Sequence, residues 1–222
     1  MLCMAKYHCL YPKNVKVVIN MPEGFYIQKA KDSSPLWISL TTCETFFKFK
    51  FCSSLIFPDT TVFEKVKKNC PYILRYRWLT PENYDFSIVN TKEKTPFSIR
   101  WINSDMGYGL FTEEDIKKNT SIGEYVGVVR QLYRYKGQQN PYCFHYPTKF
   151  WSFNYFVIDA ERQGNLTRFL NHSDNPNLKP ICVVDNKILR LFFITNTDIK
   201  KGSQLFFDYG KDFWTHRKKV TI

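Results

Sequence analysis

Apolar and polar positions change their spacing near residue 97. Beyond it, short apolar runs alternate with turn residues, a pattern typical of a β-rich domain. The run at 181–195 (ICVVDNKILRLFFIT) predicts a hairpin, because Asp185 and Asn186 between its apolar halves can adopt the positive φ angles of a tight turn. We therefore expect a mainly β fold over residues 97–214.

The region before residue 97 carries a mixed pattern. Residues 47–51 (FKFKF) alternate with period two, which predicts a half-buried strand. Residues 60–69 (TTVFEKVKKN) predict a short helix that begins near Thr60 or Thr61 and ends before Pro71. We expect a small α+β region flanking the main domain, and nothing in its sequence indicates a role.

A short segment of the chain occurs twice. Residues 115–120 (DIKKNT) are echoed by residues 198–203 (DIKKGS), and an apolar strand follows each copy. We expect both copies to contain a turn residue with positive φ, Asn119 in one and Gly202 in the other. The echo is too brief for a repeat protein and indicates two similar strand-turn-strand units.

Composition narrows the class of protein. Among 222 residues, 44% are hydrophobic and 18% aromatic, which suffices for a packed core and excludes general disorder. No apolar run reaches membrane-spanning length, and the first residues lack the apolar stretch of a secretory signal. The seven cysteines have no zinc-ligand spacing, so we expect reduced thiols and no metal site. Chance explains the grouping of Cys3, His8 and Cys9 better than a metal does.

The net charge of +12 is spread unevenly. A flanking region, residues 1–96, carries +6; the main domain, residues 97–214, carries +3; and a basic tail, residues 215–222, carries +3. Basic flanks suit nucleic acid, a nucleosome or another acidic partner. A basic surface that only confers solubility is the alternative.

Four motifs follow one another in the main domain. They are a Gly-x-Gly turn at 106–110 (MGYGL), EYVG at 124–127, RFLNHS at 168–173, and FDYG at 207–210 after an apolar strand. In this order they resemble the SET domain, the fold of most protein lysine methyltransferases. The resemblance implies a β-clip fold with a C-terminal pseudoknot, in which the third motif forms a loop through which the C-terminal stretch is threaded.

The resemblance also implies a protein-lysine N-methyltransferase that uses S-adenosyl-L-methionine and no metal. The catalytic residues are then Tyr209 and Tyr125, and the channel for the substrate lysine is lined by Tyr125, Phe207 and Trp214. The cofactor-binding residues come from the first and third motifs: Gly107, Tyr108, Gly109, Arg168, Phe169, Asn171 and His172. A water-poor aromatic channel beside a sulfonium suits this chemistry, because it disfavours the charged form of the substrate amine.

Three positions qualify the resemblance. Phe207 stands where the family carries Phe or Tyr, and phenylalanine implies room for di- or trimethyl-lysine. Asp174 replaces a cysteine that ligates zinc in many members, so the aromatic pair Phe213 and Trp214 is expected to cover the channel instead. Gln204 stands where the family usually carries a glutamate, so a charge is lost and a hydrogen-bonding side chain is kept.

In its length, the chain resembles the small stand-alone SET proteins of bacteria. The substrate would then be a histone or a bacterial histone-like protein, and the location the bacterial cytoplasm, or a host nucleus for a secreted effector. Two other hypotheses stay open. One is a non-catalytic SET-like module that binds nucleosomes or nucleic acid, and the other is a DNA-associating protein with the basic tail HRKK at 216–219.

Overall fold

The computed structural model describes residues 8–10, 22–75, 95–133, 140–146, 154–215, 217 and 219. The side chains of Cys3, His8 and Cys9, and His216 and Lys218 of the tail, lie outside this description. No helix in the described part of the chain is long and apolar enough to cross a membrane.

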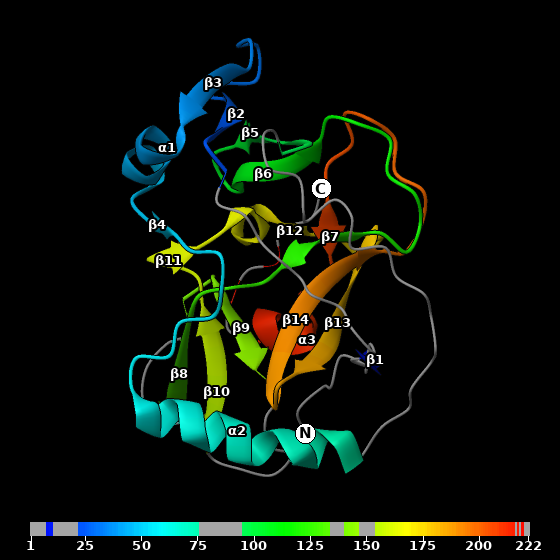
Figure 1. Ribbon diagram of the computed structural model, residues 1–222. Helices are drawn as coiled ribbons and strands as arrows, with labels where there is room; N and C mark the ends of the chain where they lie inside the picture. The colour runs from blue at the N-terminus through cyan, green and yellow to red at the C-terminus, as the bar shows by residue number, and fades with distance from the viewer. Residues whose placement is uncertain are drawn as a thin grey trace.

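Strands dominate the described chain, which confirms the expected mainly β fold (Figure 1). The strands are β1 (His8–Leu10), β2 (Gly24–Gln28), β3 (Leu36–Ser39), β4 (Lys50–Phe51), β5 (Phe97–Asn103), β6 (Gly107–Thr112), β7 (Ser121–Glu124), β8 (Val128–Tyr133), β9 (Cys143–Tyr146), β10 (Asn154–Asp159), β11 (Gln163–Gly164), β12 (Asn171–His172), β13 (Leu178–Asp185), β14 (Ile188–Thr195) and β15 (Phe206–Phe207). The helices are α1 (Leu40–Phe47), α2 (Thr60–Arg75), the 3-10 turn η2 (Leu166–Phe169) and α3 (Lys211–Trp214).

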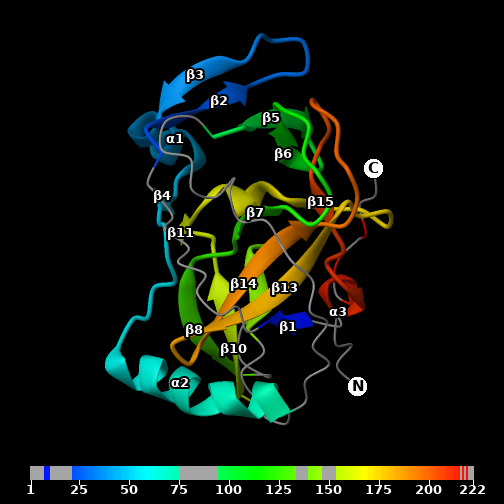
Figure 2. The same cartoon turned by 45° about the vertical axis from the view of Figure 1, so that its right-hand side comes forward.

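These strands form several small sheets around one main core. The sheets have the orders β3-β2-β5-β6, β1-β13-β14-β7 and β8-β10-β9, and two strand pairs, β11-β4 and β12-β15, complete them. Figures 1 and 2 show the first sheet at one end of the molecule and α2 across the opposite end, below β8 and β10. The first motif lies in β6 of the first sheet, and β7 and β12, which carry parts of the second and third motifs, lie between the two ends (Figure 1).

The flanking region shares a sheet with the main domain. Strand β2 pairs in parallel with β5, with Tyr26 opposite Ser98, and β4 pairs in parallel with β11. Strands from both sides of the change in sequence pattern near residue 97 thus pair with each other, and the division into two domains there stays a prediction. The strands within residues 22–51 share sheets with strands of the main domain.

Two local predictions in this region were wrong in detail. Only residues 50–51 of the expected 47–51 strand are extended, because α1 continues to Phe47 and is closed by Lys48 in the left-handed conformation, with φ 54°. Helix α2 is capped by Asp59, whose Oδ1 accepts the Val62 N–H at 2.7 Å, and it continues past Pro71. A proline removes one helical hydrogen bond without necessarily ending the helix.

The hairpin and the echo were predicted correctly. Strands β13 and β14 pair over their full lengths, and the two turn residues with positive φ are Asn186 and Lys187 rather than Asp185 and Asn186. In the echoed segments, Asn119 and Gly202 have the expected positive φ values of 67° and 83°.

The two echoed segments clasp each other reciprocally. Asp115 accepts the Lys201 N–H at 2.8 Å and pairs with Lys200 Nζ at 2.9 Å. Asp198 accepts the Lys118 N–H at 2.8 Å, in the mirrored arrangement. These backbone N–H groups, and then the lysines, lower the pKa of both carboxyls, so the clasp is intact at neutral pH and weakens as acid protonates them.

The C-terminal stretch lies against the loop of the third motif. Strand β15 pairs in parallel with β12, placing Phe207 beside His172, and the Ser173 N–H donates to the Phe207 carbonyl at 3.3 Å. This contact brings the third and fourth motifs together, as the expected pseudoknot requires.

Candidate active site

All four motifs border one cavity of about 450 Å³. Its first part is lined by Gly107, Tyr108, Phe169 and Asn171, and its second part by the aromatic residues Tyr125, Phe144, Phe207, Tyr209 and Phe213. Residues more than 100 positions apart in the sequence thus meet at one site.

The Gly-x-Gly turn forms the rim of the first part. Gly107 has φ +70°, and no atom lies within 4 Å of the position where a Cβ would stand, so a side chain there would project into open space. The Tyr108 carbonyl accepts a hydrogen bond from Asn171 Nδ2 at 3.1 Å, which ties the first motif to the third. Gly109 lies behind this rim, where a Cβ would stand 2.4 Å from Gln204 Nε2.

Arg168 is held between aromatic rings rather than by a carboxylate. Its guanidinium carbon lies 4.5 Å from the Phe49 ring centroid and 4.2 Å from that of Tyr142. Nε donates to the Ala160 carbonyl at 3.0 Å, and burial lowers the pKa of the guanidinium. Arg168 borders the cavity and fixes its wall.

His172 lies behind the cavity and does not line it. Its ring is 3% exposed, and Nδ1 accepts the backbone N–H of Tyr209 at 3.2 Å. A neutral imidazole with its proton on Nε2 satisfies this contact. His172 therefore positions Tyr209, whereas the sequence placed it among the cofactor-binding residues.

Two tyrosine hydroxyls have fixed orientations in the aromatic part. Tyr209 Oη donates to the Leu170 carbonyl at 2.7 Å, and Tyr125 Oη donates to the Tyr142 carbonyl at 2.6 Å. Burial raises the pKa of both phenols, and the nearby Tyr209 raises the pKa of Tyr125 further. Both phenols are therefore neutral at physiological pH. Because each proton is engaged by a carbonyl, the oxygen lone pairs remain as acceptors.

Phe207 forms the floor of the aromatic part. Its ring centroid lies 4.6 Å from that of Phe193, 4.7 Å from that of Tyr209 and 5.8 Å from that of Phe144. No polar group of Phe207 can hold a water molecule here.

The two C-terminal aromatic residues, Phe213 and Trp214, occupy different positions relative to the cavity. Phe213 lines the cavity and packs edge-on against Tyr209, with 4.6 Å between centroids. Trp214 is not among the lining residues: its ring is tilted against that of His172 at 4.9 Å and stacks on that of Tyr209 at 6.0 Å. The single turn of α3 directs successive side chains to different faces. Phe213 is thus the member of this pair that lines the cavity, and a role of Trp214 at the lysine channel stays a prediction.

Asp174, at the position of the missing cysteine, pairs with the tail. Its Oδ1 lies 2.5 Å from Lys219 Nζ. Arg217 lies over the Phe213 ring at 4.4 Å and donates to the Phe213 carbonyl at 2.9 Å. Together these contacts hold residues 211–215, 217 and 219 against the site, and we call these residues the C-terminal cap.

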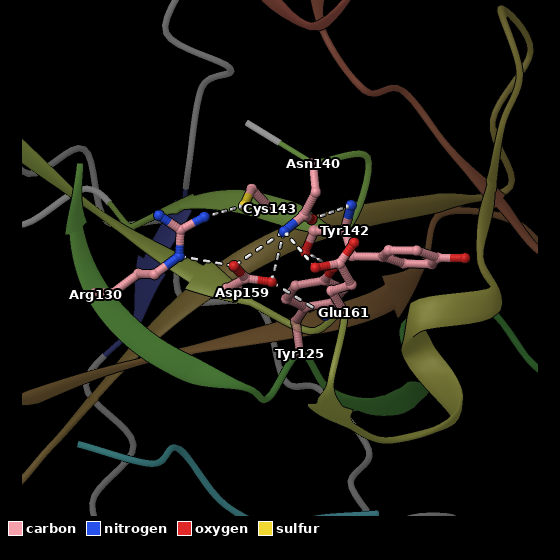
Figure 3. Close-up of polar contacts among 7 residues, drawn as sticks. All are labelled: Tyr125, Arg130, Asn140, Tyr142, Cys143, Asp159 and Glu161. Carbon is pink, nitrogen blue, oxygen red and sulfur yellow. Dashed lines mark hydrogen bonds and ion pairs between the residues drawn. The ribbon is translucent and has the colours of Figure 1, made fainter. Parts of the chain in front are cut away.

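A polar network supports Tyr125 from outside the cavity (Figure 3). Arg130 Nε donates to Asp159 at 2.7 Å, and Asn140 Nδ2 donates to both oxygens of Asp159 at 3.0 Å. Asn140 Oδ1 accepts the Tyr142 N–H at 2.9 Å and so fixes the carbonyl that receives the Tyr125 proton. Burial alone would raise the pKa of Asp159, but these hydrogen bonds outweigh it and lower the pKa.

Sequence reasoning missed several residues of the site. Asn140, Tyr142 and Phe144 precede or begin β9 and carried no motif, and Phe47 belongs to the flanking region. Only Asp159 could have been found from the sequence, because the run Ile158-Asp159-Ala160 resembles the residues that the SET domain carries at this place.

Comparison with known proteins agrees with this geometry. The SET domain family matches residues 107–210. The histone-lysine N-methyltransferase EHMT1 of Homo sapiens is 35% identical over 121 residues, covering 52% of this chain and 9% of that protein. SUV39H2 of Gallus gallus is 40% identical over 119 residues, covering 48% of this chain and 28% of that protein. The chain thus spans a minor part of these relatives' length.

Solved structures show the same fold. KRYPTONITE, in complex with mCHH DNA, an H3(1-15) peptide and SAH, superposes with a TM-score of 0.54 at 22% identity, covering 85% of this chain and 45% of that one. ATXR5, in complex with histone H3.1 mono-methylated on R26, superposes with a TM-score of 0.54 at 17% identity, covering 82% and 88%. Four ordered motifs, one shared cavity and these matches identify residues 107–210 as a SET domain.

Proposed function

We propose that the chain is a protein-lysine N-methyltransferase that transfers methyl groups from S-adenosyl-L-methionine to lysine in a histone or histone-like protein. The observation that carries this is one cavity lined both by the Gly-x-Gly turn with Asn171 and by the aromatic residues Tyr125, Phe207 and Tyr209. Relatives named histone-lysine N-methyltransferases, and a structural neighbour solved with SAH and a histone peptide, support it.

The residues at the rim fit the cofactor. The space beside Gly107 is open to a ligand, and Gly107, Tyr108 and Asn171 offer backbone and amide groups to hold its polar parts. Arg168 and Phe169 form the adjoining wall. When bound, S-adenosylmethionine supplies an electrophilic methyl group on a sulfonium.

The aromatic part prepares the substrate amine. Rings of Phe144, Phe207 and Phe213 exclude water, which disfavours the charged ammonium and favours the neutral nucleophile. Tyr125 and Tyr209 present oriented oxygens that can accept hydrogen bonds from the amine and weak C–H contacts from the methyl group. Neither phenol acts as a base, since both have raised pKa values. Alignment then supplies most of the rate, as in other well-oriented reactions.

The first experiment is transfer of labelled methyl groups from S-adenosylmethionine to mixed core histones, and then to bacterial nucleoid proteins, by the full chain. Labelling of lysine in either set supports the proposal. Cofactor binding without labelling of either set would contradict a histone or histone-like substrate. Absence of cofactor binding would favour a non-catalytic SET-like module.

Phe207 makes the product a di- or trimethyl-lysine in this proposal. Phe207→Tyr adds a hydroxyl that must find a partner in the buried floor, and the hydroxyl or a water bound to it would occupy the space of further methyl groups. We expect the variant to stop at monomethyl-lysine, with the first transfer proceeding at a rate within a few-fold of wild type. Mass spectrometry of the substrate over time measures both quantities. The same methyl count in both proteins would contradict this role of Phe207.

We further propose that the chain contacts the phosphate backbone of nucleic acid through a lysine hollow, defined as the depression lined by Lys65, Lys67, Lys68 and Lys187 with Thr61 and Glu64. Val66 anchors α2 in the core, which leaves Lys65 and Lys68 on the outer face. Among the described residues, Lys67 lies 3.9 Å from Glu64, and Lys65, Lys68 and Lys187 have no ion pair. Four lysines against one glutamate attract phosphate.

Reversing charge in the lysine hollow should weaken DNA binding. We expect Lys65→Glu, Lys68→Glu and Lys187→Glu combined to lower the affinity for duplex DNA at least tenfold and to flatten its salt dependence. The control reverses two charges, replacing Lys117 and Lys200 by Glu, and losses are compared per reversed charge; these exposed lysines already face Asp198 and Asp115. Fluorescence anisotropy at several salt concentrations measures both variants. Equal losses in the two would show a general charge effect and contradict a local site.

A further inference from the structure

Phe47, the last residue of α1, lies on the cavity wall although it stands 60 positions before the matched SET domain. Its ring centroid is 4.9 Å from that of Tyr108, at an interplanar angle of 89°, and 4.7 Å from that of Phe169. Phe47 thus connects the first and third motifs at the rim of the site. Among the described residues, its ring contacts are with Phe46, Tyr108 and Phe169, none of which belongs to the aromatic part of the cavity.

The chain around Phe47 holds its position firmly. Lys48 closes α1 in the left-handed conformation and donates its N–H to the Glu44 carbonyl. The Glu44 carboxylate accepts the Phe51 N–H at 2.8 Å and pairs with Lys50 at 2.9 Å, which fixes the turn that follows. Phe49, buried to 4% exposure, packs on Arg168 and so attaches the same turn to η2.

The neighbouring ring provides a contrast. Phe46 is 41% exposed and lies under Lys29 Nζ, whereas Phe47 packs between motif residues. The helix therefore delivers one aromatic ring to the cavity and leaves the other at the surface. A phenylalanine can pack in the core without bordering an open cavity, so burial alone does not explain the position of Phe47.

We infer that Phe47 is a binding residue for S-adenosylmethionine, a wall of its site that comes from outside the SET domain. The inference rests on the proposed function, because it assigns the rim of the cavity to the cofactor. A rigid apolar ring beside the Gly107–Asn171 rim gives a ligand with a flat heteroaromatic group and an alkyl chain a surface to pack on. It also gives residues 22–51 a function, since they carry and fix this ring.

Isothermal titration of the full chain with S-adenosylmethionine tests the inference. Phe47→Ala should raise the dissociation constant about tenfold or more, while Phe47→Leu, which keeps an apolar wall, should lose only a few-fold. The matched control is Phe57→Ala, which truncates a ring in the same region that packs on Phe63 and does not line the cavity. Thermal unfolding of each variant identifies any that fail to fold.

Kinetics separates binding from a general structural role. With Phe47→Ala or, if that variant is unfolded, Phe47→Leu, we expect KM for the cofactor to rise and kcat at saturating cofactor to stay within a few-fold of wild type. Affinity equal to that of Phe57→Ala would overturn the inference alone. Failure of the wild type to bind S-adenosylmethionine would overturn both the inference and the proposed function.

Discussion

Replacing Tyr209 by phenylalanine should lower the rate of methyl transfer on the order of 10²-fold, because the variant loses the oxygen that orients the reacting groups. The hydroxyl is fixed by the Leu170 carbonyl at 2.7 Å, and the ring is packed against Phe207 and Phe213. Phenylalanine keeps this ring packing and the His172 contact to the backbone. Cofactor affinity should therefore change little.

The measurement is labelled methyl transfer beside titration with S-adenosylmethionine. A fall in kcat with unchanged cofactor affinity supports the role of the oxygen. Tyr142→Phe serves as the control, since Tyr142 also lines the cavity but offers its backbone carbonyl, not its hydroxyl, to Tyr125. Activity of Tyr209→Phe close to that of this control would contradict a catalytic Tyr209.

Replacing Arg190 by methionine should destabilise the fold by about 3–5 kcal/mol, the usual cost of leaving a buried charge without its partner. Glu124 is 1% exposed, and its two oxygens receive Arg190 Nε at 3.0 Å and Nη2 at 2.5 Å. Burial raises the pKa of Glu124, and the guanidinium opposes that rise. Without it, the carboxyl must be buried as an isolated charge or take up a proton.

Urea unfolding of Arg190→Met measures this cost. The double variant Glu124→Leu with Arg190→Met should recover much of it, because an apolar pair needs no compensation. Lys117→Met, which removes an exposed partner of Asp198, should cost less than about 1 kcal/mol. A loss for Arg190→Met as small as that of Lys117→Met would mean that the buried pair contributes nothing particular.

The sequence predicted those parts of the structure that depend on local chemistry. The β13–β14 hairpin and the positive φ of Asn119 and Gly202 follow from residues within each turn. The left-handed Lys48 was missed because alternating Phe and Lys favour a strand, while a helix ending there depends on how α1 packs.

The site was predicted to the extent that its residues lie in motifs. Gly107, Asn171, Phe207 and Tyr209 all border the predicted cavity. Phe47 and Asn140 could not be assigned in this way, because they lie outside the motifs. Phe213 was expected to cover the channel together with Trp214, and it lines the cavity. The His172 ring lies behind the cavity, which the motif could not indicate because a motif gives the order of residues and not their depth; its contact with the cofactor stays a prediction.

The C-terminal cap has a consequence for the conditions under which the site stays closed. A closure built on thiolates and metal opens when thiols are oxidised or a chelator removes the ion. The contacts described here are an ion pair between the Asp174 carboxylate and the Lys219 ammonium, and the packing of the Phe213 and Trp214 rings. Oxidants of thiols and chelators act on none of these groups, whereas ionic strength screens the exposed Asp174–Lys219 pair. We therefore expect the C-terminal cap to keep these contacts when the surroundings become oxidising or reducing.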